Sequence, residues 1–140
     1  MILQTNSPEE TIAAGEKLAA LLRPGDVIAY QGGMGMGKTT FTIGLARGLG
    51  LDAWVSSPTF ALVQEYPGPT PLCHFDMFRI ATLDDLYSTG FFDYLDRGCI
   101  LAIEWSENIA QALPQPHITV AFAPRGEEGR TITITGDERF

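Results

Sequence analysis

The chain of 140 residues has the length of one compact domain and is long enough to bury a sizeable hydrophobic core. Hydrophobic residues make up 45% of it and charged residues 19%, a composition that excludes a disordered or low-complexity chain. Nine Lys and Arg against seventeen Asp and Glu give a net charge of −8, which argues against a broad electrostatic grip on nucleic acid by this chain alone. We expect a single domain over residues 1–140, with only an indirect connection to RNA.

The two cysteines, Cys73 and Cys99, lie in different segments and lack the paired spacing of a zinc site or a disulfide framework. We expect both to be reduced thiols buried in the core. The N-terminal stretch MILQTNSPEE lacks a basic flank followed by an apolar segment, and no apolar run approaches the length that spans a bilayer. These features predict a cytoplasmic protein with no membrane association.

The first predicted helix starts close to the N-terminus. Ser7 suits the N-cap, Pro8 suits the first helical position, and Glu10 would complete a capping box. Apolar residues then recur at helical spacing. We therefore expect a helix that begins after Ser7 and is ended by Pro24 and Gly25.

A strand, a glycine-rich loop and a second helix are predicted next, in that order. Residues 26–32, DVIAYQG, form a short apolar run that predicts a buried strand. Residues 39–50, TTFTIGLARGLG, predict the helix that leaves the loop, and Gly48 and Gly50 stop it. This order is the setting in which a phosphate-binding loop is found.

Two antiparallel strands and two short helices follow. The strands cover FALVQEY, residues 60–66, and PLCHFDMF, residues 71–78, and the turn-forming PGPTP joins them. Short helical regions are centred on TLDDLY, residues 82–87, and FFDYL, residues 91–95.

The last third of the chain completes the predicted sheet. CILAIEW, residues 99–105, is an apolar run closed by Glu104, as expected of a central parallel strand that is buried on both faces. HITVAFAP, residues 117–124, and RTITITG, residues 130–136, alternate β-branched residues and predict a hairpin around the RGEEGR loop.

The glycine-rich loop matches a phosphate-binding pattern. Gly32, four further residues, Gly37, Lys38 and Thr39 fit G-x-x-x-x-G-K-[ST], the P-loop. The glycines let consecutive backbone N–H groups point inward, and the N-terminus of the following helix adds its positive dipole. Lys38 would reach the β and γ phosphates, and the Thr39 hydroxyl would bind magnesium. The alternative is a glycine-rich turn with a chance lysine, which explains neither the spacing nor the setting.

Two acidic residues at predicted strand ends could hold magnesium or position water. Asp76 lies in HFDMFR, and Glu104 follows the apolar run CILAI. Glu104 should emerge at the carboxyl edge of the sheet, where ligands bind in open α/β folds. For each residue the alternative is an ordinary solvent-facing strand end.

Three further residues each have two interpretations. His74 should share a strand face with Asp76, so it could orient that carboxylate or relay a proton, or it could be an ordinary structural histidine. Thr59, after the stiffening Pro58, could contact the γ phosphate as switch residues do, or belong to a turn before a strand. Trp105 either stacks on a base or packs in the core.

Taken together, GMGKTTF, SSPTFALVQEY, HFDMFRI and AIEWSE resemble, in their order and separations, the bacterial TsaE family. The resemblance spans nearly the whole chain. A P-loop is shared by many families, but the other three stretches are far more specific. The resemblance implies an α/β fold, a P-loop NTPase-like three-layer domain whose central parallel sheet is flanked by antiparallel strands.

The resemblance also implies a function. TsaE proteins are ATPases of the machinery that makes threonylcarbamoyladenosine in tRNA, and they associate with the TsaB–TsaD pair, in which TsaD transfers the group. ATP hydrolysis by TsaE is thought to reset that complex between cycles. The partners implied here are therefore TsaB and TsaD, with tRNA contacted only indirectly through the complex.

The catalytic and metal-binding residues follow from the matching motifs. Thr39 and Glu104 would hold Mg²⁺, and Lys38, Asp76 and Glu104 would be the catalytic residues. Lys38 and the metal would stabilise charge, while one of the two acids would position water in line with the γ phosphate.

The nucleotide-binding residues are also carried over from the resemblance. Thr59 would belong to the switch, Trp105 would lie near the nucleotide, and Thr11 in the first helix would approach the adenine side. The phosphates of ATP or ADP would be bound by Gly32, Gly33, Met34, Gly35, Met36, Gly37, Lys38, Thr39 and Thr40.

Three positions depart from the family pattern. The family commonly has an aspartate where this chain has Gly33, a basic residue in place of Ser56, and a tyrosine in place of Phe78. None of these changes removes a phosphate ligand. The missing aspartate leaves metal and water organisation to Asp76 and Glu104.

The sequence leaves several alternatives. Instead of a slow ATPase, the chain could be a docking module in which ATP orders residues 56–66 and hydrolysis is incidental. A small-molecule kinase is disfavoured because no arginine-rich lid segment is present, and a GTPase because no N-K-x-D motif occurs. Arg79 could be an arginine finger, an exposed ion-pair partner or a contact to another protein.

Overall fold

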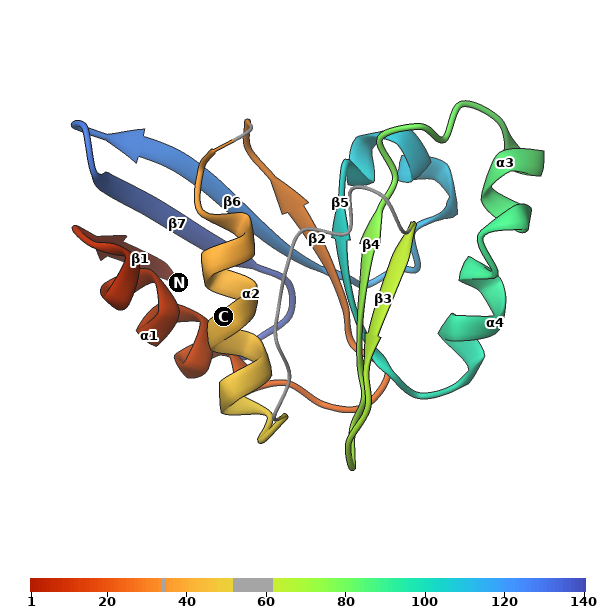
Figure 1. Ribbon diagram of the computed structural model, residues 1–140, viewed down its shortest axis with the longest axis horizontal. Coiled ribbons are helices and arrows are strands. Elements are labelled where there is room, and N and C mark those ends of the chain that lie inside the picture. Colours follow the sequence, from red (N-terminus) through yellow and green to blue (C-terminus); the bar gives the residue numbers. More distant parts are fainter. Residues whose placement is uncertain (34, 52–61) are drawn as a thin grey trace.

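A single mixed sheet forms the centre of the computed structural model, which describes residues 1–33, 35–51 and 62–140 (Figure 1). The chain runs in order through β1 (Ile2–Thr5), α1 (Pro8–Ala19), β2 (Val27–Gln31), α2 (Lys38–Gly48), β3 (Val63–Tyr66), β4 (Leu72–Asp76), α3 (Leu83–Ser88), α4 (Phe91–Asp96), β5 (Ile100–Glu104), the 3₁₀ segment η1 (Ser106–Ala112), β6 (Ile118–Arg125) and β7 (Gly129–Thr135).

The order of strands across the sheet is β1-β7-β6-β2-β5-β4-β3. β6, β2, β5 and β4 are parallel neighbours, whereas β1 and β7 on one side and β3 on the other pair antiparallel. The predicted central parallel sheet with antiparallel flanks is confirmed, and so is the β6–β7 hairpin. β5 is buried along its whole length, which explains why its sequence is uninterruptedly apolar up to Glu104.

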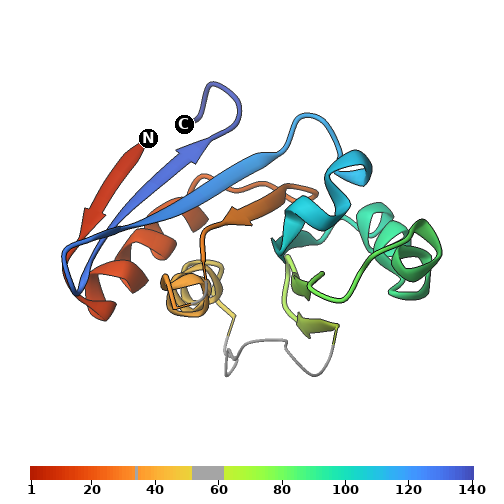
Figure 2. The same cartoon turned by 90° about the horizontal axis from the view of Figure 1, so that it is seen from above.

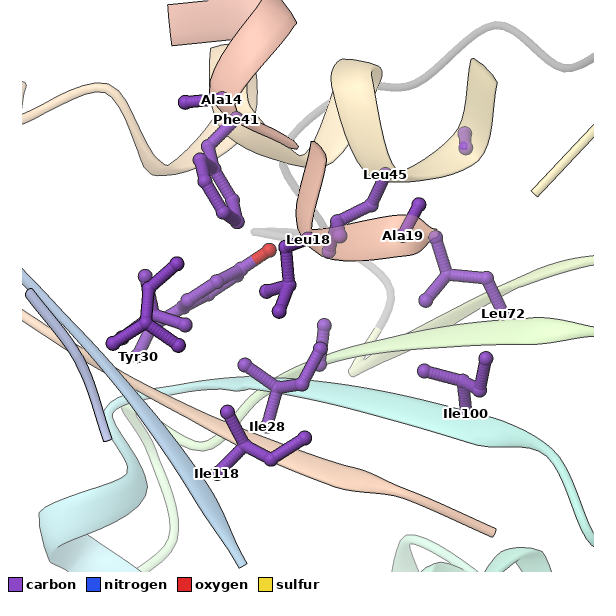
Figure 3. Close-up of a cluster of buried hydrophobic side chains, with 14 of the residues drawn as sticks. Ala14, Leu18, Ala19, Ile28, Tyr30, Phe41, Leu45, Leu72, Ile100 and Ile118 are labelled. Carbon is purple, nitrogen blue, oxygen red and sulfur yellow. The ribbon is translucent and has the colours of Figure 1, made fainter. Parts of the chain in front are cut away.

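Helices cover both faces of the sheet, so the core is divided into two parts (Figure 2). α1 and α2 pack on one face, where Tyr30 and Ile28 of β2 meet Phe41 and Leu45 of α2 (Figure 3). α3, α4 and η1 cover part of the other face, over residues such as Phe75 of β4. Alternate side chains of the parallel strands therefore belong to different core clusters, as the period of two in a strand requires.

α1 and α2 lie side by side and approach each other closely through two glycines (Figures 1 and 2). A Cβ atom on Gly44 would lie 2.0 Å from the carbonyl oxygen of Ile12, and one on Gly15 would lie 2.2 Å from the carbonyl oxygen of Phe41. No side chain larger than hydrogen fits at either position without moving backbone. The spacing of α1 and α2 thus depends on these glycines.

Two details differ from the sequence predictions. α1 ends at Ala19, earlier than Pro24, because Leu21 N–H donates to Leu18 and Leu22 N–H donates to Ala19 in a tighter turn. Ser7 caps the helix as predicted, but the carboxylate of Glu10 accepts the N–H of Asn6 rather than that of Ser7.

One strand, β1, was missed altogether. Its four residues pair with β7 near the other end of the chain, and the amino group of Met1 donates to the carbonyl oxygen of Ile134. Such a short strand has little local signal, and it is stabilised by contacts that are far away in sequence.

The predicted burial of the cysteines is confirmed, since Cys73 and Cys99 are both buried as free thiols. Burial raises the pKa of the Cys73 thiol well above its usual value, which keeps it neutral. Among the described residues, none of the helices has the length and hydrophobicity needed to cross a bilayer.

The close approach of the two helices generates a prediction. Gly44→Ala should lower the free energy of unfolding by about 3 kcal/mol, the upper end of the usual cost of overpacking, because the new methyl group meets backbone that cannot rotate away. Arg47→Ala, on the exposed side of the same helix, is the matched control and should change stability by less than about 0.5 kcal/mol. Urea denaturation measures both, and equal small effects would contradict this account of the packing.

Candidate functional site

A cavity of about 610 Å³ lies where the parallel strands β4 and β5 end and α2 begins. The N-cap Ser7 and the helix residues Pro8 and Thr11 form one wall, and the hairpin of β6 and β7 forms another. The remaining lining comes from the glycine-rich loop, the start of α2 and the ends of β4 and β5. The lining residues are Ser7, Pro8, Thr11, Gly35, Gly37, Lys38, Thr39, Thr40, Asp76, Phe78, Glu104, Trp105, Glu127, Glu128 and Arg130.

The glycine-rich loop leads into α2, whose N-terminus lines this cavity. Gly37 is the N-cap with φ 97° and ψ 14°, a left-handed conformation that side-chain-bearing residues rarely adopt. Within the described part of the chain, no side chain caps the helix. The N–H groups of its first turn have no partner outside the helix among the described residues, so they can bind an anion, and the helix dipole favours negative charge there.

Lys38 adds a buried positive charge at the same point. The residue is 7% exposed, its Nζ donates to the carbonyl oxygen of Gly32 at 2.9 Å, and it lies 5.7 Å from the ring centre of Trp105. Among the described residues no carboxylate forms an ion pair with it. A buried ammonium group of this kind is poised to pair with an anion that enters the cavity.

The two predicted acidic residues are brought together opposite the loop. Asp76 and Glu104 are partners in the parallel register of β4 and β5, so both emerge at the carboxyl edge, as predicted. Asp76 is half-buried, and its Oδ1 accepts the N–H of Phe78 at 2.9 Å. Glu104 is buried, but it still lines the cavity.

His74 does not contact Asp76, which corrects one interpretation of the sequence. Its Nε2 lies 2.7 Å from Oε2 of Glu104, and the ring is completely buried. The parallel register explains this pairing, because His74 is opposite Ala102 and therefore faces the same side as Glu104, two residues further along β5.

Trp105 has an unusual backbone directly after Glu104. Its φ of 58° and ψ of 39° place it in the left-handed region, which is uncommon for a bulky residue. The hydroxyl of Ser106 donates to the carbonyl oxygen of Tyr30 and fixes the chain just beyond it. The Trp105 ring packs on Phe78, with ring centres 5.0 Å apart, and it both lines the cavity and packs against the core cluster that contains Phe75.

The other sequence-predicted residues have different outcomes. Thr40 and Gly35 line the cavity, while Gly32, Gly33 and Met36 are not among its lining residues. Thr11 lines it too, although its hydroxyl pairs with that of Thr5 at 2.9 Å. Met34, Ser56, Pro58 and Thr59 lie outside the described residues, so the predicted switch segment is not tested.

Two further predictions concern Gly33 and Arg79. A Cβ atom on Gly33 would meet no atom of the described residues within 4 Å, so there is room for a side chain at this position, where the resembling family commonly has an aspartate. Arg79 is exposed, and within the described residues it forms no ion pair, which does not support the ion-pair interpretation.

Sequence reasoning missed the residues that the β6–β7 hairpin contributes. Glu127, Glu128 and Arg130 line the cavity, and Nη2 of Arg130 donates to the carbonyl oxygen of Gly35 at 3.2 Å. Their position follows from β6 pairing beside β2, a contact between distant parts of the chain. The acidic and basic residues of RGEEGR were visible, but nothing local placed them near the loop.

The free N–H groups and Lys38 lead to a prediction about anion binding. Magnesium pyrophosphate should raise the melting temperature of the wild-type chain, because it can occupy the N-terminus of α2. Lys38→Met should remove most of that increase, whereas Lys17→Met, at an exposed position of α1, should preserve it. Thermal denaturation with and without the anion measures this, and equal shifts in both variants would exclude Lys38 from the binding site.

Comparison with known proteins places the chain in a family. A sequence model described as "Threonylcarbamoyl adenosine biosynthesis protein TsaE" matches residues 5–132. The protein of Bacillus subtilis named "tRNA threonylcarbamoyladenosine biosynthesis protein TsaE" is 39% identical over 133 residues, covering 94% of this chain and 83% of that protein. The protein of the same name from Treponema pallidum is 35% identical, covering 93% of this chain and 96% of the relative.

A solved structure supports the same relationship. The crystal structure of YdiB from Bacillus subtilis superimposes with a TM-score of 0.81 at 36% sequence identity, covering 97% of this chain and 84% of that one. The P-loop NTPase-like α/β fold implied by the sequence resemblance is thereby confirmed together with the arrangement of the sheet. The chain belongs to the TsaE family.

Proposed function

We propose that this chain is a magnesium-dependent ATPase of tRNA threonylcarbamoyladenosine biosynthesis, which acts on a TsaB–TsaD complex rather than transferring the threonylcarbamoyl group itself. The observation that carries the proposal is the arrangement of Lys38 and Thr39 at the start of α2, facing Asp76 and Glu104 across one cavity. The place in tRNA modification rests on family membership and on the names of the relatives.

The charges around the cavity support a requirement for a divalent cation. Among the described lining residues, four side chains are carboxylates, those of Asp76, Glu104, Glu127 and Glu128, and two, Lys38 and Arg130, are cationic. A polyphosphate entering alone would be repelled by this excess of negative charge. A metal ion bound with the phosphates would offset this negative charge. The net negative charge of the whole chain adds to the requirement for a cation.

The residues present fit magnesium. Mg²⁺ in nucleotide sites is held by one or two protein oxygens together with phosphates and water, so a cluster of protein ligands is not required. In agreement with this, the described residues contain no group of three or more His, Cys, Asp and Glu that could hold a metal by themselves. Glu104 Oε2 is buried without a hydrogen-bond partner in the described part of the chain, and Thr39 lines the same cavity. Thr39 and Glu104 would therefore hold the ion, which would supply charge neutralisation.

The roles of the other residues follow from their positions. Lys38 and the N–H groups of the first turn of α2 would bind the phosphates and stabilise the negative charge that develops on them. Asp76 is the more exposed of the two acids, and it would orient the attacking water. The Trp105 and Phe78 rings would cover the cavity and help to exclude bulk water.

The proposed activity is tested by measuring phosphate release from Mg-ATP by the chain, alone and with the TsaB–TsaD pair. We expect slow release that the pair stimulates. Asp76→Asn should reduce turnover at least tenfold while ATP still binds, because a positioned acid or base contributes about 10²–10⁴-fold. Asp93→Asn, on an exposed residue of α4, should leave the rate unchanged.

Three outcomes would redirect the proposal. Undiminished release by Asp76→Asn would remove Asp76 from the mechanism. Tight ATP binding with slow release that the TsaB–TsaD pair does not change would favour a nucleotide-controlled docking module. No binding of ATP at all would exclude both.

A further inference from the structure

His74 occupies a position where an imidazole ring is costly. It is completely buried in the middle of β4, between Cys73 and Phe75, which are apolar and also completely buried. A polar side chain in such a place lowers stability unless another group compensates for its lost hydration. The proposed ATPase mechanism assigns no task to this ring.

In the part of the chain that the structure describes, the polar group next to Nε2 is the carboxylate of Glu104. Tyr30 meets the ring edge-on, with centres 6.3 Å apart, but its hydroxyl is already paired with that of Thr42 at 2.7 Å. Oε2 of Glu104 is 2.7 Å from Nε2, although the N–H does not point at it in hydrogen-bond geometry. Within the described residues neither ring nitrogen of His74, nor Oε2 of Glu104, has a partner in hydrogen-bond geometry.

The strand register explains how the two groups meet. Ala102 is directly opposite His74 on the neighbouring strand β5, and Glu104 is the next residue of β5 on the same face. The small side chain of Ala102 leaves room for the ring to lie along the sheet toward Glu104. The contact is therefore built from two adjacent, buried strands rather than from a mobile loop.

We propose that His74 is a positioning residue for Glu104: a small rotation of the ring aligns Nε2–H with Oε2, which is only 2.7 Å away, and the resulting hydrogen bond orients the carboxylate toward the cavity for metal binding. The claim that this orientation serves metal binding rests on the proposed function. The contact between His74 and Glu104 does not. Glu104 has a side chain that is 11% exposed and lines the cavity, so a ring behind it can fix its orientation without blocking a ligand. Partners of metal ligands commonly act in this way, and losing one typically costs 10–100-fold in metal affinity or activity.

The contact itself can be tested in the nucleotide-free protein by NMR with ¹⁵N-labelled histidine. The chain has only two histidines, His74 and His117, so the spectra are simple to assign. We expect His74 to carry a proton on Nε2, and Glu104→Gln to shift its ring signals. His117, whose Nδ1 lies 2.9 Å from the carbonyl oxygen of Pro114, is the internal control and should not change. An unprotonated Nε2, or unchanged His74 signals in Glu104→Gln, would overturn the proposal.

The effect of His74 on metal binding is tested with two variants. Each of them replaces the ring by an amide group that can take the place of one of the two ring nitrogens. The amide nitrogen of His74→Gln can reach the place of Nε2, whereas the shorter side chain of His74→Asn reaches only the place of Nδ1. In the presence of ADP, His74→Asn should weaken Mg²⁺ binding at least tenfold, and His74→Gln should stay within about threefold of the wild type. ADP binding without Mg²⁺ should be unchanged in both, and their melting temperatures control for folding.

The outcomes separate this inference from the proposed function. Equal losses in the Gln and Asn variants would show that the ring only fills space, which overturns the positioning role. If the wild type binds ADP but no Mg²⁺, both the role of His74 in metal binding and the proposed magnesium dependence would be overturned. The NMR result would still decide whether His74 and Glu104 form the contact.

Discussion

The parallel pairing of β2, β5 and β4 determines where the glycine-rich loop and the two acids of the site lie. Because parallel strands end at the same edge, the glycine-rich loop after β2, Glu104 at the end of β5 and Asp76 at the end of β4 converge on one cavity. The buried central strand holds them rigidly, and α2 closes the site from the side of the loop. The pairing of these three neighbouring strands thus places an anion-binding helix N-terminus opposite two carboxylates.

Local and global electrostatics act in opposite directions in this chain. Its net charge of −8 repels nucleotides, yet the uncapped N-terminus of α2 and the buried Lys38 create a small positive region beside the acids. A metal ion would bridge the two regions. The phosphates would bind at the positive region, and the cation bound to them would be held by Glu104. The same negative surface makes direct binding of tRNA by this chain alone unfavourable, and a role within a protein complex is consistent with it.

The sequence predicted those parts of the site that depend on local pattern. The loop, the helix after it and the two acids at strand ends all have signals within a few residues, and the structure places them as expected. Arg130 and His74 could not be assigned in the same way, because their partners, Gly35 and Glu104, are brought near only by strand pairing. β1 was missed for the same reason, and Thr59 lies outside the described residues.

The proposed function requires a magnesium nucleotide to bind between α2 and the ends of β4 and β5. A crystal structure with ADP and Mn²⁺ in place of Mg²⁺ tests it most directly, because the anomalous signal locates the metal. We expect the β phosphate at the first turn of α2 and the metal between Thr39 and Glu104. A nucleotide bound elsewhere, or a metal remote from Glu104, would contradict it.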